Sequence, residues 1–214
     1  MSNTQEQRRD DAALVLPPQA VKVAFLTVRE VIGQGGMNTL LRHAGLAEYV
    51  GRTELEAGES VTFGDIGRLT ETMADVYGQY GAKAILQRLG RVQFRTWQEA
   101  YPTALGTAKT ALRAFPVQTR LRLALNSVSL AARQIAHVEC RVSQNGKALV
   151  FEALQCPYCS TVRAEQPFCH TAVGALEEVA LWASNGKRFT VEETACRAMG
   201  HPACRFTVTT KPPE

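Results

Sequence analysis

The sequence predicts an α+β fold in which a helical N-terminal half packs on a small antiparallel sheet. Apolar residues recur every three or four positions from about Val21 to about Gln134, which is the period of amphipathic helices. After His137 the period falls to two residues, which is typical of half-buried strands. The change of period divides the chain into a helical half and an α/β half.

Composition predicts a single folded unit. The chain has 214 residues, of which 45% are hydrophobic and 21% are charged, so it is long enough to bury one good core. We expect a flexible tail followed by one domain that has a helical half and a metal-bearing α/β half. The expected ranges are 1–20 for the tail, 21–214 for the domain, 21–134 for its helical half and 135–210 for its α/β half.

The helical half is divided by glycine and proline. Breaks are expected at Gly33 to Gly36, at Gly58, at Pro102 and at Pro116, because these residues end helical patterns. The stretch "GQGG" in the first break is expected to be a turn, since it lacks the preceding strand of a dinucleotide-binding fingerprint. The runs between the breaks include "VKVAFLTVREVIG", "MNTLLRHAGLAEYVG", "FGDIGRLTETMADVYGQYGAKAILQRLGRVQFRTWQEAY" and "TALGTAKTALRAF".

The α/β half begins with a hairpin. The runs "HVECRVS" and "KALVFEAL" are separated by Gln144, Asn145 and Gly146, and Asn-Gly is the strongest short hairpin signal. The stretch "CHTAVGALEEVALWAS" then returns to helical spacing and is expected to end at Asn185 and Gly186. Two further strands, in "KRFTVEETAC" and "CRFTVTT", complete the expected sheet.

Charge and hydropathy restrict the classes of partner. The chain has 24 basic and 20 acidic residues, and the formal charge of +4 is spread thinly, which does not favour nucleic acid as a partner. No run of eighteen apolar residues occurs, and the stretch "MSNTQEQRRDDAA" lacks the apolar core of a signal peptide. We therefore expect a cytoplasmic protein without stable membrane insertion, in which clustered cysteines indicate metal or redox chemistry.

Five of the six cysteines stand at the ends of expected elements. Loops can bring such residues together, and zinc and iron sites need convergent soft ligands, usually four, so we expect about one tightly bound zinc rather than iron. Two cysteines follow the second strand, one begins the helix, one ends the third strand and one begins the fourth. They are Cys156 and Cys159, then Cys169, Cys196 and Cys204.

Glu193 adds a possible hard ligand three residues before Cys196. Residues three apart on a regular strand face opposite sides of the sheet, so both could bind one ion only if the strand bends. Gly200 and Pro202 form an expected turn immediately afterwards, which favours such a bend.

The stretch "CPYC" at residues 156–159 has an alternative interpretation, because the same four letters form the active site of glutaredoxins. That chemistry requires the motif on the first turn of a helix within an early β-α-β unit. Here the motif is followed by "STVRAEQPF", which has no helical pattern. We therefore expect Cys156 and Cys159 to have a metal-binding or structural role, with thiol redox chemistry as the alternative.

The stretch "CHTAVGALEEVALW...GKRFTVEETACRAMGHPACRF" resembles the 4-vinyl reductase (4VR) domain family. The family is named after a bacteriochlorophyll-biosynthesis protein and includes the sensor half of phenol- and xylene-responsive activators; subunits of the TRAPP trafficking complex are more distantly similar. The resemblance is strongest over residues 137–208. It rests on a combined spacing that is filled by Cys169, Gly174, Glu193, Cys196, Gly200 and Cys204.

The resemblance implies a mixed α/β ligand-binding fold, often dimeric, with a buried pocket for a hydrophobic small molecule. In the aromatic-sensing relatives, cysteines and a glutamate hold a zinc ion that supports the pocket. By carry-over, the ligands here would be Cys169, Glu193, Cys196 and Cys204. Cys156 and Cys159 depart from that pattern: they could replace Glu193, form a second site or act as redox-sensitive thiols.

Two functions follow from these observations. The first is a metal-braced protein that binds a hydrophobic or aromatic ligand, with a tetrapyrrole intermediate as one candidate, and acts as a carrier, sensor or accessory factor in (bacterio)chlorophyll biosynthesis. Its expected assembly is a homodimer formed through the helical half. Arg91 and Arg95 would either form a solvated face or meet tetrapyrrole carboxylates. The alternative is an enzyme, either a reductase that takes electrons from a partner or a thiol-redox enzyme that uses Cys156 and Cys159.

Overall fold

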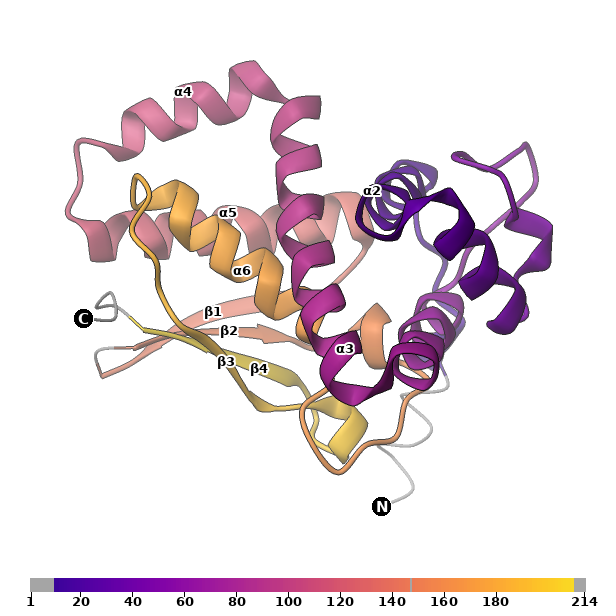
Figure 1. Cartoon of the computed structure of the whole chain (residues 1–214). Helices are drawn as coiled ribbons and strands as arrows, with labels where there is room; N and C mark the ends of the chain where they lie inside the picture. Colours follow the sequence, from indigo (N-terminus) through magenta and orange to yellow (C-terminus); the bar gives the residue numbers. More distant parts are fainter. Residues whose placement is uncertain (1–9, 147, 210–214) are drawn as a thin grey trace.

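The computed structural model describes residues 10–146 and 148–209, and it confirms the α+β class. Helices form one layer of the molecule and a four-stranded sheet forms the other (Figure 1). The longer helices are α2 (Pro18–His43), α3 (Phe63–Ala100), α4 (Pro102–Leu112), α5 (Val117–Ala136) and α6 (His170–Ala183). The strands are β1 (Cys140–Asn145), β2 (Ala148–Ala153), β3 (Val191–Ala195) and β4 (Cys204–Val208).

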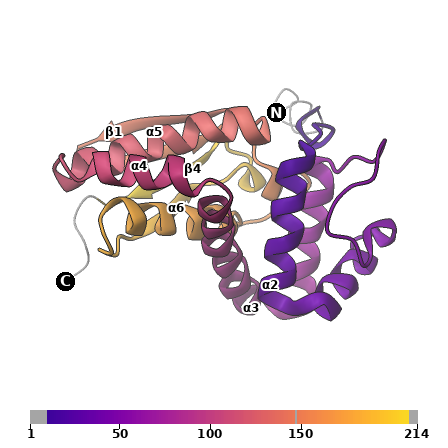
Figure 2. The same ribbon diagram turned by 90° about the horizontal axis from the view of Figure 1, so that it is seen from above.

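Helices α2 and α3 lie side by side, and each is broken at a glycine with positive φ (Figure 2). Gly33 has φ 75° and Gly78 has φ 68°, a region of backbone conformation that other residues rarely adopt. The break at Gly33 agrees with the expectation from "GQGG". The break at Gly78 was not expected, because apolar residues keep their helical spacing on both sides of it.

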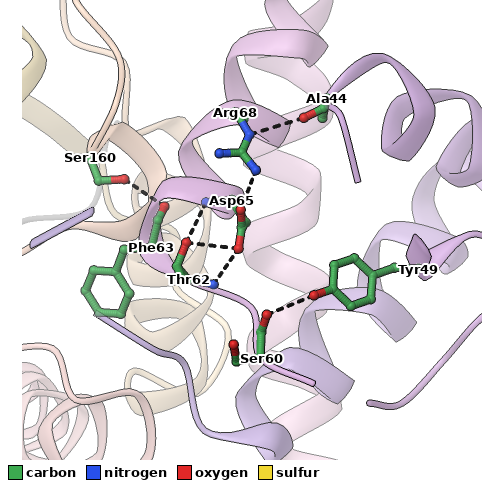
Figure 3. A network of polar contacts seen from close by, with 8 residues as sticks. All are labelled: Ala44, Tyr49, Ser60, Thr62, Phe63, Asp65, Arg68 and Ser160. Carbon is green, nitrogen blue, oxygen red and sulfur yellow. Dashed lines mark hydrogen bonds and ion pairs between the residues drawn. The ribbon is translucent and has the colours of Figure 1, made fainter. Parts of the chain in front are cut away.

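The start of α3 is fixed by a capping box and by the loop that contains "CPYC" (Figure 3). The hydroxyl of Thr62 accepts a hydrogen bond from the Asp65 amide, and the Asp65 carboxylate accepts one from the Thr62 amide at 2.7 Å. Arg68 donates to Asp65 at 2.5 Å. The hydroxyl of Ser160 donates to the carbonyl of Phe63 at 2.7 Å, so the first turn of α3 is tied directly to the cysteine-bearing half.

The sheet is antiparallel throughout and has the strand order β1-β2-β4-β3. The expected hairpin is present: Cys140 is paired with Ala153, and Gly146 at the turn has φ 57°. On one face of the sheet, large apolar side chains such as Phe151 and Phe206 are buried. Figure 1 shows α5 and α6 on one side of the sheet, with α6 joining β2 to β3.

Helices α3 and α6 cross at two glycines. A Cβ atom added at Gly174 would lie 1.9 Å from the carbonyl oxygen of Gln87. A Cβ atom added at Gly90 would lie 1.9 Å from the carbonyl oxygen of Thr171. The two backbones are therefore too close for any side chain at the crossing, and this contact joins the helical half to the α/β half.

Part of the expected tail packs against the domain. Asp11 and Leu16 are buried, and the amide of Leu16 donates to the carbonyl of Val61 at 2.9 Å. The first nine residues of the expected tail lie outside the described part of the chain. None of the helices in the described ranges combines the length and the apolar content needed to cross a membrane.

Candidate metal centre

Five cysteines converge in the interior, each from the end of an element. Cys156 and Cys159 flank the short turn η2 (Pro157–Cys159), and Cys169 is the residue before α6. Cys196 lies between β3 and the short turn η3 (Arg197–Met199), and Cys204 begins β4. All five are buried, with exposed fractions of 4% for Cys156 and 0% for the others.

The distances between these sulfur atoms match those of a tetrahedral metal site. The Sγ atom of Cys169 lies 3.4 Å from that of Cys156, 3.8 Å from that of Cys196 and 3.6 Å from that of Cys204. The Sγ atoms of Cys159 and Cys204 are 3.5 Å apart. In a tetrahedral zinc site with Zn–S bonds of about 2.3 Å, the ligand atoms are about 3.8 Å from one another.

The donor atoms form two overlapping sets of four. Within each set, all four ligand atoms lie within 4.8 Å of one another. The first set is entirely sulfur, and the second contains a carboxylate oxygen. The sets are Cys156, Cys159, Cys169 and Cys204, and Cys169, Glu193, Cys196 and Cys204.

Glu193 reaches the cluster because β3 is irregular. The pairing of β3 with β4 shifts register between Glu193 and Ala195, which is the bend that Glu193 and Cys196 require to face one site. The Glu193 Oε2 atom accepts a hydrogen bond from the Cys169 amide at 2.8 Å. Its Oε1 atom is buried and has no hydrogen-bond partner among the described residues, and burial raises the pKa of this carboxyl. A buried carboxylate oxygen without a donor is a suitable ligand for a cation.

The thiols differ in how readily they ionise. Hydrogen bonding, chiefly from Cys156, lowers the pKa of Cys159 well below its ordinary value, whereas burial raises the pKa of Cys169. Cys140 is outside both sets of donor atoms, and burial raises the pKa of its thiol to about 12. Because metal ligands must lose their protons, a cluster that already favours one thiolate is prepared for a cation.

The loops that carry Cys156 and Cys196 have the same local form. Each cysteine has an extended backbone and is followed directly by a short 3-10 turn. The second turn is anchored by Arg197, whose buried guanidinium pairs with Asp11 at 2.5 Å and also donates to the Leu154 carbonyl. The cysteine loops are therefore held to the packed N-terminal segment and to the end of β2.

The "CPYC" stretch does not begin an α-helix, in agreement with the sequence pattern. Its only regular structure is the three-residue turn η2, and the chain then runs irregularly to Cys169. The Tyr158 hydroxyl in this turn donates to Gln93 of α3 at 2.9 Å. A catalytic dithiol needs an exposed sulfur, which the burial of both cysteines does not provide.

A groove of about 830 Å³ runs between α3, the segment 162–170 and β3, and reaches Glu193. Apolar side chains such as Val162, Phe168 and Val173 line part of it, and charged side chains line the rest. His170 also lines it, and burial together with nearby Lys83 lowers the pKa of this imidazole to about 4. The sequence did not predict the groove, because its walls come from three distant segments with no shared motif.

Other candidate residues have structural partners. Arg91 pairs with Glu177 at 2.6 Å and Arg95 pairs with Glu178 at 3.2 Å, so both arginines join α3 to α6. The aromatic residues on the same stretch also pack locally. Phe94 meets Trp182 edge to face at a centroid distance of 6.0 Å, and Trp97 stacks on Tyr101 at 5.9 Å.

Comparison with known families identifies the cysteine-bearing half. Residues 149–210 match the 4-vinyl reductase (4VR) domain. These residues, called the 4VR segment below, contain all six donor residues of the two sets, and the match confirms the resemblance to this family. No curated protein matches the chain.

Solved structures of H-NOX domains share the fold over nearly the whole chain. One, an oxygen-binding H-NOX domain related to soluble guanylate cyclases, is 16% identical with a TM-score of 0.56 and covers 91% of this chain and 95% of that chain. Another, an H-NOX protein from S. oneidensis, is 11% identical with a TM-score of 0.55, covering 90% and 99%. The phenol-responsive sensory domain of the activator PoxR, with phenol, is 18% identical with a TM-score of 0.49, covering 75% and 78%.

Proposed function

We propose that the protein is a metal-braced domain that binds a hydrophobic or aromatic small molecule and acts as a sensor, carrier or accessory factor. The observation that carries this proposal is the position of Glu193, which belongs to one set of metal donors and also lines the groove. A metal ion held by Glu193 would therefore fix one wall of the groove. The 4VR match and the H-NOX-like fold, a fold whose solved relatives include oxygen-binding domains, support this assignment.

The proposed metal is zinc, held by Cys169, Glu193, Cys196 and Cys204, with Cys156 and Cys159 as further donors. Thiolates in mutual contact suit a single tetrahedral ion. An iron–sulfur cube places each cysteine on a different iron and so spreads the sulfur atoms, which fits this packed cluster less well. The ion would hold loops that have little regular structure of their own, and its binding would contribute to folding.

The groove sets the size of the proposed ligand. Its volume of about 830 Å³ is that of a site for a small organic molecule. Val162, Phe168 and Val173 offer an apolar surface, and Lys83 and Arg163 could pair with carboxylates. A tetrapyrrole intermediate with carboxylate side chains fits both features, which is the basis for a proposed place in (bacterio)chlorophyll biosynthesis.

Titration calorimetry with two probes tests the binding function. Protoporphyrin IX represents a carboxylated tetrapyrrole and phenol represents a small aromatic compound. Ala164→Trp would place an indole in the groove and should weaken binding at least tenfold, whereas Ala114→Trp changes an exposed alanine outside the groove and should leave binding unchanged. Absence of binding by either probe, or equal effects of both substitutions, would contradict the proposed site.

We also propose that the helical half forms a homodimer. Val76 and Tyr77, next to the break at Gly78, are 45% and 38% exposed despite their apolar side chains. Burial of such residues against a second copy is favourable. Light scattering at micromolar concentration should give twice the chain mass, and the double variant Val76→Glu, Tyr77→Glu should give the monomer mass. A monomer mass for the unmodified chain would exclude this assembly.

A catalytic role for the "CPYC" cysteines is the weaker alternative, and we propose that the pair is structural. The support is the burial of Cys156 and Cys159 and the lack of a helix after them. The chain should reduce glutathione-mixed disulfides no faster than free cysteine does. Rapid turnover that is abolished by Cys159→Ser, with an unchanged circular dichroism spectrum, would favour the thiol-redox enzyme instead.

A further inference from the structure

We propose that the centre holds two metal ions bridged by the thiolates of Cys169 and Cys204. This inference deepens the proposed function, which requires only one ion. Its starting point is that the two sets of donors are not separate sites: both contain Cys169 and Cys204, whose Sγ atoms are 3.6 Å apart. The geometry is that of two tetrahedra that share one edge.

The number of donors agrees with two ions. Two tetrahedral ions need eight coordination positions, and the two sets together contain six donor residues. Six donors fill eight positions when two of them bind both ions. The two shared residues are both cysteines, and a thiolate sulfur has enough lone pairs to bridge two cations. Cys156 and Cys159 would complete the first ion, and Glu193 and Cys196 the second.

A single ion would leave two buried donors without a cation, whichever set it occupied. If the ion took the set that contains Cys156 and Cys159, the Glu193 Oε1 atom would stay buried without a partner beside several sulfur atoms. If it took the other set, the two "CPYC" sulfurs would be left in the interior in contact with zinc-bound thiolates. Buried polar groups normally have partners, so both arrangements are unfavourable.

Charge points in the same direction. Five thiolates and one carboxylate carry six negative charges, which one divalent ion leaves poorly balanced in a buried site. Arg197, which follows Cys196 directly, is already paired with Asp11 and the Leu154 carbonyl. A second divalent ion would supply two further positive charges where the donors converge. With bonds of about 2.3 Å to both bridging sulfurs, the two ions would be about 3 Å apart.

Metal content of the full chain, purified under reducing conditions without added metal, tests the inference. Mass spectrometry of the metals should find two zinc ions per chain. After exchange with ¹¹³Cd²⁺, nuclear magnetic resonance should show two cadmium signals coupled to each other through the bridging sulfurs. One ion per chain at saturation, or two uncoupled signals, would overturn the bridged pair.

Paired variants locate the two ions. The double variant Cys156→Ser, Cys159→Ser should lower the metal content from two ions to one, and Glu193→Gln with Cys196→Ser should do the same. Cys140→Ser, which changes a buried thiol outside both sets, should retain two ions. If the double variants do not fold, the content and coupling measured on the unmodified chain still decide the question.

The outcomes separate this inference from the proposed function. A chain with one ion that still binds protoporphyrin IX or phenol would leave the proposed function intact and remove the second ion. A chain with two coupled ions that binds neither probe would do the reverse. A chain without metal above background would contradict both the bracing ion and the bridged pair.

Discussion

The helical half and the 4VR segment are held together by different kinds of interaction. In the helical half, large apolar side chains such as Phe63, Met37 and Leu40 are almost fully buried between long helices. In the 4VR segment, the loops around the cysteines contain only three-residue turns, yet they bring five sulfur atoms into contact in the interior. Apolar packing is sufficient for the first region, whereas the second needs a cation to hold its polar donors together.

The largest expected effect comes from removal of a ligand that both donor sets share. Cys204→Ser should lower the free energy of unfolding by about 5 kcal/mol, because metal binding is linked to folding. Metal content should fall in parallel. Cys140→Ser should cost far less, since Cys140 lies outside both sets. Urea unfolding followed by circular dichroism, with metal analysis of the same samples, gives both quantities. Equal losses for the two variants would mean that the cluster is ordinary core.

The crossing of α3 and α6 is the joint between the two regions, and its disruption should rank second. Gly174→Ala should cost about 4 kcal/mol, because the added Cβ atom would lie 1.9 Å from the Gln87 carbonyl oxygen and the helices would have to separate. Gly35→Ala is the matched control. No atom lies within 4 Å of a Cβ atom at that exposed helical position, so stability should stay the same or rise slightly. A small effect at Gly174 would show that the joint is looser than the structure indicates.

A cavity in the helical half should separate stability from metal content. Leu40 is 1% exposed in the core between α2 and α3. Leu40→Ala should lower the free energy of unfolding by about 3 kcal/mol while the metal content of the folded protein stays unchanged. Urea unfolding and metal analysis measure the two effects. Loss of metal in this variant would show that the two regions do not have separate sources of stability.

The smallest expected effect is at the cap of α3. Thr62→Ala removes one hydrogen bond of the capping box and should cost about 1 kcal/mol. Thr39→Ala, at an exposed position inside α2, should change stability by less than about 0.5 kcal/mol. Thermal unfolding of the two variants provides the comparison. A cost at Thr62 as large as that of Leu40→Ala would mean that the link through Phe63 to Ser160 depends on this cap.

Local sequence patterns predicted most of the fold because they report local physical requirements. The fall in period after His137 placed the hairpin, and Asn145 with Gly146 placed its turn. The break at Gly78 was missed because a single glycine inside an apolar pattern does not reveal its φ angle. The contact of Gly90 with α6 was also beyond the sequence, since a close approach depends on a partner that is distant along the chain.

The candidate site was predictable to the extent that its residues lie at the ends of elements. The convergence of the cysteines followed from that placement, and the bend that Glu193 needs is present as a register shift in β3. The overlap of the two donor sets depends on the packing of separate loops, which spacing does not specify. Arg91 and Arg95 gave no sign of their pairing with Glu177 and Glu178, because those partners lie on another helix.

The most direct test of the account is hydrogen exchange measured on the metal-loaded chain and on the same chain after chelation under reducing conditions. The account predicts that chelation greatly accelerates amide exchange in segments 154–169 and 196–204, which surround the cluster. Amides in the buried part of α2 around Leu40 should keep most of their protection. Unchanged exchange around the cysteines after complete removal of metal would contradict the claim that a metal centre holds the 4VR segment together.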